Sequence, residues 1–394
     1  MANWGRILLF LLFLFFPFGQ LEKLPLGIGG VSIYLHDLVL ILLWVWLLVK
    51  KRSWLEDLKR SGIVNRFGIF AVVAFLSWLI ALLKWGFGPS LLGLAYLIRF
   101  VLLSGVYFVI WVLVDSGEAK AGQVNKLLRG SIFWTAIFGW IQYFFWSDLT
   151  HLKYLGWDDH YFRLTGTFLD PNFMGIILVF GLGLEFLRKR PTFFKKLFLL
   201  ITLAFTYSRS SWLSWLVLLF GWAFYYLFVK NFKGLFSSFA NIFSKGLIAG
   251  KFALWLMISV IIFFVLPRPA GEGGNLMRTV STYARFENWQ QSWQVIRENP
   301  LVGVGFNNYQ LASSGNNKAD NSFLLVWATA GAIGLIAFLF WVVGLKPLWL
   351  VFPLIVHSFF NNSFFYPWVL LLVWGMQGLF KPYFIKEGSA NKNE

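Results

Sequence analysis

The sequence has no cysteine in its 394 residues and only 4 histidines. The absence of cysteine excludes disulfide bonds and thiol chemistry. Charged residues are also scarce, at 13% of the chain, whereas hydrophobic residues reach 58% and aromatic residues 21%. Such a composition suits lipid rather than water as the solvent, so the chain is not expected to form ordinary soluble domains.

Long apolar runs, separated by charged residues, proline or glycine, make up most of the chain. A helix rises 1.5 Å per residue and the hydrocarbon core of a bilayer is about 30 Å thick, so runs of roughly 15 to 24 apolar residues predict membrane-spanning helices. We therefore predict an all-α polytopic membrane protein, a single membrane domain over residues 1–394 with about 12 transmembrane helices. The runs cover approximately residues 6–18, 33–49, 67–84, 91–114, 131–147, 173–187, 194–207, 212–229, 247–266, 321–345, 347–360 and 364–381.

The formal net charge of +17 raises the question of a nucleic-acid partner. If the N-terminus lies inside and the runs alternate, the basic clusters at residues 50–52 and 188–190 fall on inner segments, together with the C-terminal lysines. On the outer segments, basic and acidic residues nearly balance. This is the positive-inside pattern of membrane proteins, which predicts cytoplasmic N- and C-termini and leaves a nucleic-acid partner without support.

One segment, residues 267–320, has no membrane-length apolar run. The predicted orientation makes it a large extracytoplasmic loop. It carries Arg278, Arg285 and Asp320, so it is the part of the chain where polar chemistry is most expected.

Within this loop, residues 285–296 predict an amphipathic helix, because Trp289, Trp293 and Ile296 recur at i, i+4 and i+7. We expect the tryptophan stripe of this helix to lie on the membrane interface.

The ends of the same helix are marked by polar residues. Ser281 or Thr282 is expected to cap its start, and Asn299-Pro300 is expected to end it. Arg285 then falls in the first turn, where its charge opposes the helix dipole. It is either a solvated side chain or one that binds an anion.

Three further charged residues lie at the ends of apolar runs. Arg209 sits in the tight connection 207–211, where it either faces an outer cavity or snorkels to the membrane surface. Asp320 precedes a run, where a plain helix N-cap is an alternative to a functional carboxylate. Asp170 is expected to be an N-cap with Pro171 at the first helical position.

Arg99 lies inside an apolar run, and an intramembrane arginine is a functional candidate because its burial is costly. It is expected either to reach a lipid phosphate or to snorkel outward. His357, Asn361 and Asn362 are weaker candidates for the same outer cavity.

No metal site is predicted. The outer segment with His151, Asp158, Asp159 and His160 has no spacing typical of metal ligands, so a solvated loop is the better interpretation.

Several segments, in a fixed order, resemble the O-antigen ligase and polymerase superfamily. The most characteristic is Asn321 followed, after nine residues, by Gly331-x-x-Gly334, with Asp320 where the family usually has a histidine. Taken as sequence alone, the two glycines are one turn apart and would let another helix approach closely. The resemblance covers roughly residues 160–380 and includes Gly166-Thr167-Phe168-Leu169-Asp170-Pro171-Asn172, Tyr207-Ser208-Arg209, Arg285 before Trp289, and Asn299-Pro300-Leu301-Val302-Gly303-Val304-Gly305-Phe306-Asn307-Asn308-Tyr309.

The resemblance implies a glycosyltransferase, without metal or cofactor, in the bacterial cytoplasmic (inner) membrane. Its donor would be a polyprenyl-diphosphate-linked oligosaccharide, and its acceptor a glycolipid or glycan at the periplasmic face. Arg209 and Arg285 match the family's functional arginines, which suit a diphosphate because they bind phosphate oxygens in a bidentate fork. Asp320 would take the acceptor's proton, and direct attack would invert the anomeric centre.

The remaining candidate substrate-binding residues are Arg99, Asp170, Asn172, Arg278 and Asn321. Membrane lipids are the other expected partner.

Three functions remain open from the sequence. Transfer of a lipid-linked glycan leads, either as an O-antigen ligase or as a surface-polysaccharide polymerase. A polysaccharide or solute transporter would need charged or broken helices near the midplane of the bilayer, where this chain has few ionisable residues. A scaffold in an envelope-assembly complex would use the large outer loop for docking.

Overall fold

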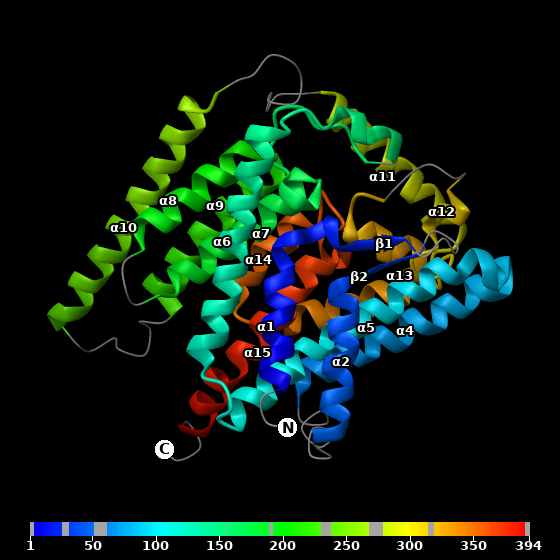
Figure 1. Ribbon diagram of the computed structural model, residues 1–394, viewed down its shortest axis with the longest axis horizontal. Coiled ribbons are helices and arrows are strands. Elements are labelled where there is room, and N and C mark those ends of the chain that lie inside the picture. Colours follow the sequence, from blue (N-terminus) through cyan, green and yellow to red (C-terminus); the bar gives the residue numbers. More distant parts are fainter. Residues whose placement is uncertain are drawn as a thin grey trace. The chain divides into compact units, whose positions relative to one another are not determined.

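The computed structural model describes residues 4–25, 31–50, 61–155, 157–188, 192–229, 238–267, 279–313 and 319–390. These residues are mainly α-helical, as the apolar runs predict (Figure 1). They divide into two compact units, each made of separate stretches of the chain. Unit 1 comprises Met1–Ser131, Thr279–Leu345 and Ser358–Glu394, and unit 2 comprises Ile132–Arg278 and Lys346–His357.

Unit 1 is a helical bundle with one small hairpin. In the hairpin, β1 (Lys23–Pro25) pairs antiparallel with β2 (Ser32–Tyr34). The helices are α1 (Trp4–Phe15), α2 (Leu35–Lys50), α4 (Gly62–Trp85), α5 (Phe87–Asp115), the start of α6 (Ala121–Phe145), α11 (Val280–Glu298), α12 (Tyr309–Ala312), α13 (Ser322–Gly344) and α15 (Pro367–Ala390).

Aromatic side chains fill the core of unit 1, where α5 packs on α15 and α4 packs on α13. Trp341 stacks on Trp374 with centroids 5.7 Å apart, and Phe67 meets Trp374 edge-on at 4.8 Å. Such offset and edge-to-face pairs stabilise the bundle beyond the area they bury.

Unit 2 is built around the pair α9 (Arg209–Phe224) and α14 (Leu348–His357), with α7 (Pro171–Phe186) against both. Gly175 allows this closeness, because a Cβ there would lie only 2.1 Å from Oγ of Ser211. The other elements are the remainder of α6, the short helices η2 (Thr150–Leu155) and η3 (Gly166–Phe168), α8 (Phe193–Phe205), η4 (Tyr225–Val229) and α10 (Ser238–Val265).

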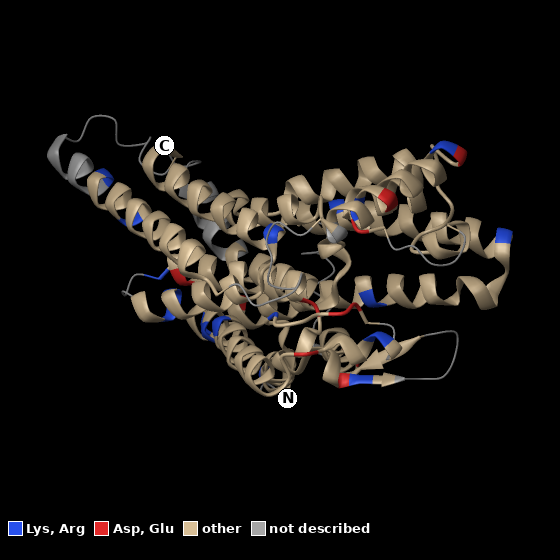
Figure 2. Ribbon diagram, turned by 90° about the horizontal axis from the view of Figure 1, so that it is seen from above, with Lys and Arg blue, Asp and Glu red and all other residues tan. Residues whose placement is uncertain are grey.

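Each of the twelve predicted runs falls on a helix of the structure. Among the described residues, six helical stretches are long and apolar enough to cross a membrane, and four shorter helices are apolar. Long parts of the helical ribbon carry no Lys, Arg, Asp or Glu (Figure 2). The chain is therefore an all-α, multi-pass membrane protein. The cytoplasmic termini, the count of about 12 and the periplasmic loop stay predictions.

The helix α13 is broken in its middle, at Gly331. This residue has φ +68 and ψ −173, so the helical path stops there and restarts. A Cβ on Gly331 would lie 2.1 Å from the carbonyl oxygen of Leu301. The prediction that these glycines admit a neighbouring helix is thus wrong for Gly331, where the close neighbour is the loop of residues 300–305. At Gly334 a Cβ would lie 3.9 Å from Val73 of the helix α4.

This loop pairs with the backbone groups that the break frees. The N–H groups of Val304 and Gly305 donate to the carbonyl oxygens of Ala328 and Thr329 at 3.0 and 2.8 Å. On the other side of the break, the N–H of Ala332 donates to the carbonyl oxygen of Pro300 at 2.9 Å. A broken helix in a membrane requires such internal pairing, because lipid offers no hydrogen bonds.

Candidate functional site

The loop helix α11 begins earlier than the sequence suggested. Its first residue is Val280, and the preceding Thr279 makes no side-chain cap. The capping roles expected for Ser281 and Thr282 are wrong, because both lie inside the helix. Arg285 consequently falls in the second turn rather than the first, where it is half-buried.

The inner face of α11 packs on α13 through a seam that is apolar at one end and polar at the other. Val295 and Ile296 are buried, and Ser292 is buried one turn earlier. Ile296 is in the core, whereas Trp293 is 44% exposed and packs edge-on against Trp327 of α13, so the three residues do not share one environment. The position of the tryptophans at the membrane interface stays a prediction.

The polar end of the seam holds Asp320. Its Oδ2 accepts a hydrogen bond of 2.5 Å from the side-chain amide of Asn288 on α11. The N-cap of α13 is Asn321, whose Oδ1 accepts from the N–H groups of Phe323 and Leu324 at 2.8 and 3.1 Å. The expected N-cap at Asp320 is therefore wrong by one residue: Asn321 is the cap, and the carboxylate of Asp320 binds Asn288 of α11.

Further contacts fix the start of α13. Oγ of Ser322 donates to the carbonyl oxygen of Asn361 at 3.1 Å, and the side-chain amide of Asn362 donates to the carbonyl oxygen of Ala319. Asn361 and Asn362, expected to line a cavity, hold the segment that carries Asp320.

Tyr309 of α12 completes this group, which we call the Asp320 cluster: Asn288, Ser292, Tyr309 and Asp320. Its hydroxyl lies 3.2 Å from Oγ of Ser292. Burial raises the pKa of Tyr309, and the nearby negative charge of Asp320 raises it further, against the lowering effect of the Ser292 hydrogen bond. The amide of Asn288 thus contacts the carboxylate directly, and the phenol of Tyr309 lies close enough for its pKa to respond to the carboxylate charge.

In unit 2, Arg209 is the first residue of α9. Ser208 caps the helix by accepting from the N–H of Ser211 at 3.4 Å. Tyr207 adopts φ +50 to make the tight turn from α8, and its hydroxyl donates to the carbonyl oxygen of Pro267. Buried Arg163 donates from Nε to the carbonyl oxygen of Thr206 at 3.0 Å, which stabilises the turn before Arg209.

Asp170 caps α7, as predicted, with Pro171 at the first helical position. Its side chain accepts from the N–H groups of Asn172 and Phe173. Burial raises the pKa of Asp170, and the cap hydrogen bond from Asn172 opposes this shift. One carboxylate oxygen, Oδ1, thus serves the helix end, and a substrate-binding role for Asp170 stays a prediction.

Asn172 belongs to a buried network at the start of α9. Its Oδ1 accepts from Oγ of Ser208 at 2.7 Å. His357, the last residue of α14, places Nε2 3.1 Å from Oγ of Ser210 and 3.2 Å from Oγ of Ser211. The network fixes the turn that presents Arg209. His357 is fully buried and stabilises this turn through the two serines.

Arg99 of α5 lies in unit 1 and is paired. Its Nε donates to Oδ1 of Asp37 at 2.9 Å and its Nη2 donates to Oδ2 at 2.7 Å. Nη2 also donates to the carbonyl oxygen of Ser32 at 2.5 Å. This ion pair explains why the apolar run tolerates an arginine. Because the carboxylate of Asp37 balances the charge of Arg99, a lipid phosphate would meet little net positive charge there.

The predicted residues divide between the two units. Unit 1 holds Arg99, Arg285, Asp320 and Asn321, and unit 2 holds Asp170, Asn172 and Arg209. Arg278 lies outside the described residues.

Sequence reasoning missed Asp37, Asn288, Arg163 and the role of His357. Of these four, Asn288 could have been predicted from the sequence, because Asn288 and Ser292 recur at i, i+4 on the helix that carries Arg285.

Among the residues that the structure describes, no group of three His, Asp or Glu side chains is placed to hold a metal ion.

Comparison with known families now bears on this arrangement. Residues 196–339 match the family model described as O-antigen ligase. The matched segment is similar to the O-antigen ligase family. It contains Arg209, Arg285, Asp320 and the break at Gly331, so the predicted resemblance to the ligase and polymerase superfamily is confirmed. No curated protein matches the chain.

Within the matched segment, the spacing from Asn321 to Gly331 corresponds to a structural unit. Asn321 caps the first half of α13, and Gly331 ends it. The segment that begins at Asn299 is the loop that enters the break. Two of the motifs that carried the resemblance are thus parts of one structure, which sets the position of Asp320.

Proposed function

We propose that the protein transfers a glycan from a polyprenyl-diphosphate donor to a glycolipid or glycan acceptor at the outer face of the bacterial cytoplasmic membrane. The observation that carries this proposal is the O-antigen ligase match over residues 196–339, which includes all three proposed catalytic residues. The family supports a membrane glycosyltransferase in general terms. The donor, the acceptor and the orientation are parts of the proposal.

In this proposal, Arg209 and Arg285 bind the diphosphate. As the bond to the anomeric carbon breaks, negative charge grows on the leaving diphosphate, and guanidinium groups stabilise it without a metal ion. The position of Arg209 at the N-terminus of α9 adds to this effect, because helix N-termini favour anions.

Asp320 acts as the base that removes the proton from the attacking hydroxyl of the acceptor. Its hydrogen bond with Asn288 orients the carboxylate. Attack by the acceptor on the face opposite the diphosphate inverts the configuration at the anomeric carbon.

A polymerase is the second candidate, because it uses the same donor and differs only in acceptor. A transporter has one feature in its favour, the broken helix α13. However, the backbone groups of residues 328–329 and 332–333 at this break are paired with the loop of residues 300–305 or with Ser77, so they are not available to an ion.

The test is to reconstitute the purified protein with a polyprenyl-diphosphate oligosaccharide and to identify the products. Longer lipid-linked chains indicate a polymerase, and glycan moved to lipid A-core indicates a ligase. We expect either reaction to persist in EDTA. Recovery of unchanged donor with both acceptors present would contradict the proposal.

Arg209→Ala and Arg285→Ala are expected to abolish transfer while expression and membrane insertion remain normal. Each variant removes a permanent positive charge that would stabilise the leaving diphosphate. The matched control is Arg297→Ala, which removes an exposed arginine from the same helix as Arg285. Normal turnover in both Arg209→Ala and Arg285→Ala would refute the assigned roles.

A further inference from the structure

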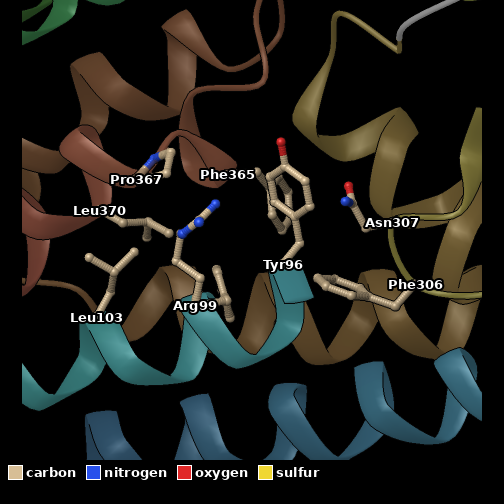
Figure 3. Close-up of a pocket in the computed structure, with 9 residues that line it drawn as sticks. Tyr96, Arg99, Leu103, Phe306, Asn307, Phe365, Pro367 and Leu370 are labelled. Carbon is tan, nitrogen blue, oxygen red and sulfur yellow. The ribbon is translucent and has the colours of Figure 1, made fainter. Parts of the chain in front are cut away.

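Unit 1 contains a pocket apart from the Asp320 cluster (Figure 3). It lies between α5, the loop around Phe306 and the start of α15, and it is a shallow hollow: the roughly 290 Å³ of empty space among its residues includes open solvent. The lining residues are Tyr96, Arg99, Phe100, Leu103, Phe306, Asn307, Phe365, Pro367 and Leu370.

Aromatic rings form one side of the pocket. Phe100 stacks on Phe365 with centroids 5.7 Å apart, and Phe306 meets Phe365 at 6.0 Å. Phe100 and Phe306 are buried, whereas Tyr96 is 38% exposed at the pocket. The phenylalanine rings thus form a rigid apolar wall, and the ring of Tyr96 lies exposed beside it.

Polar groups without protein partners face the same space. Within the part of the chain that the structure describes, no hydrogen bond is made by the hydroxyl of Tyr96, the side chain of Asn307 or Nη1 of Arg99. In Figure 3, Arg99 points from α5 into the pocket, and Asn307 lies beyond Tyr96. The three groups offer both donors and acceptors to a ligand.

The wall that carries Asn307 is held in place. Asn307 itself has φ +53, a left-handed conformation that asparagine tolerates better than most residues. Gly93 of α5 lets this wall approach, because a Cβ there would lie 2.4 Å from Nδ2 of Asn308. The amide of Asn308 in turn donates to the carbonyl oxygen of Phe306 at 2.9 Å.

Charge separates the ligand classes. The bidentate pair with Asp37 balances Arg99, so an anion entering the pocket gains little net attraction. A hydrocarbon chain would bury the Tyr96 hydroxyl and the Asn307 amide without hydrogen bonds, which is costly. A neutral sugar avoids both penalties, since its C–H face packs on aromatic rings and its hydroxyls pair with the polar groups.

We propose that this pocket binds a neutral sugar residue of the acceptor glycan. Recognition of a sugar rests on the pocket alone. The assignment to the acceptor rests on the proposed function, because the pocket and Asp320, the proposed base for the acceptor hydroxyl, belong to the same unit. Asn307 is also two residues from Tyr309 of the Asp320 cluster.

Binding is tested by saturation-transfer NMR on the full-length protein in lauryldimethylamine oxide micelles, whose headgroup carries no sugar. The probes are free neutral oligosaccharides of glucose, galactose, mannose, rhamnose and N-acetylglucosamine, together with inorganic phosphate and farnesol. We expect saturation of ring protons in at least one oligosaccharide. Tyr96→Ala and Asn307→Gly should weaken this binding about tenfold, and glycine keeps the left-handed backbone at position 307.

The matched control is Phe87→Ala, which removes an exposed aromatic residue from the same helix but outside the pocket. It should bind as the wild type does. Oligosaccharide binding that is absent, or unchanged in both pocket variants, would overturn the proposal. So would binding of phosphate or farnesol that depends on Tyr96.

Transfer kinetics then separate the two proposals. Tyr96→Ala should raise the KM for the acceptor about tenfold and leave kcat within about twofold. An unchanged acceptor KM in a variant that has lost sugar binding would remove the acceptor assignment alone. Sugar binding by a wild-type protein that transfers no glycan would remove the proposed function and leave the pocket as a sugar site.

Discussion

Asp320 is the residue whose surroundings say most about the chemistry. The amide of Asn288 binds its carboxylate, and the next residue, Asn321, takes over the capping of α13. Without Asn321, a carboxylate at the helix start would itself accept the hydrogen bonds of the first N–H groups as the N-cap. The two adjacent side chains therefore have different roles: Asn321 caps α13, and Asp320 is oriented by Asn288.

The residue-scale prediction follows from that arrangement. Asp320→Asn removes the basic carboxylate but retains a side-chain oxygen that can still accept from Asn288. We expect kcat for glycan transfer to fall by about 10² to 10⁴, the usual contribution of a general base, and the donor affinity to change little. The measurement is initial-rate kinetics with donor binding followed in parallel.

Asn288→Ala is the companion variant. It removes only the group that orients Asp320, so its kcat should lie between those of Asp320→Asn and the wild type. If Asp320→Asn kept full kcat, the assignment of Asp320 as the base would fail.

At the scale of elements, α13 and the loop of residues 300–305 form one structure. Gly331 requires a positive φ, and its missing Cβ leaves room for the carbonyl of Leu301. Any larger residue must both strain the backbone and displace the loop.

We therefore predict that Gly331→Ala lowers the free energy of unfolding by about 2 kcal/mol or more, since the positive φ alone costs about 1–2 kcal/mol. Thermal unfolding followed by tryptophan fluorescence measures this. The control is Gly68→Ala in the helix α4, where an added Cβ meets no atom within 4 Å. Helix propensity should make that change neutral or stabilising by up to about 1 kcal/mol. Equal melting temperatures for the two variants would contradict the role of the break.

The sequence predicted the elements better than their contacts. Apolar runs predicted the helices because membrane thickness imposes a length that composition reveals. Asp170 was correctly predicted as a cap because capping is local. The pairing of Arg99 with Asp37 was not predictable, since the two lie 62 residues apart and meet only through packing.

The break in α13 was missed for a related reason. Gly331 and Gly334 are one helical turn apart, which also fits two helices in close contact. Only the backbone hydrogen bonds to residues 300–305, some thirty residues away in the chain, distinguish the two cases.

At the scale of the whole molecule, the lack of cysteine makes the predicted orientation directly testable. A single introduced cysteine is the only thiol in the chain. Tyr154, 94% exposed in a predicted outer segment, and Lys120, exposed in a predicted inner segment, are suitable positions.

We predict that a membrane-impermeant maleimide labels Tyr154→Cys in intact spheroplasts, and labels Lys120→Cys only after the membrane is permeabilised. The positive-inside distribution of the basic residues is the physical reason. Labelling of Lys120→Cys in intact spheroplasts together with protection of Tyr154→Cys would reverse the orientation and with it the outer-face reaction.

The broken helix also constrains how the protein is made. The loop of residues 300–305 leaves the ribosome before α13 does. As an apolar stretch of 23 residues, α13 is able to enter the membrane as one continuous helix. It can break only when the loop supplies partners for its freed backbone groups. The break, and with it the position of the segment that begins at Asp320, therefore depends on this loop being in place.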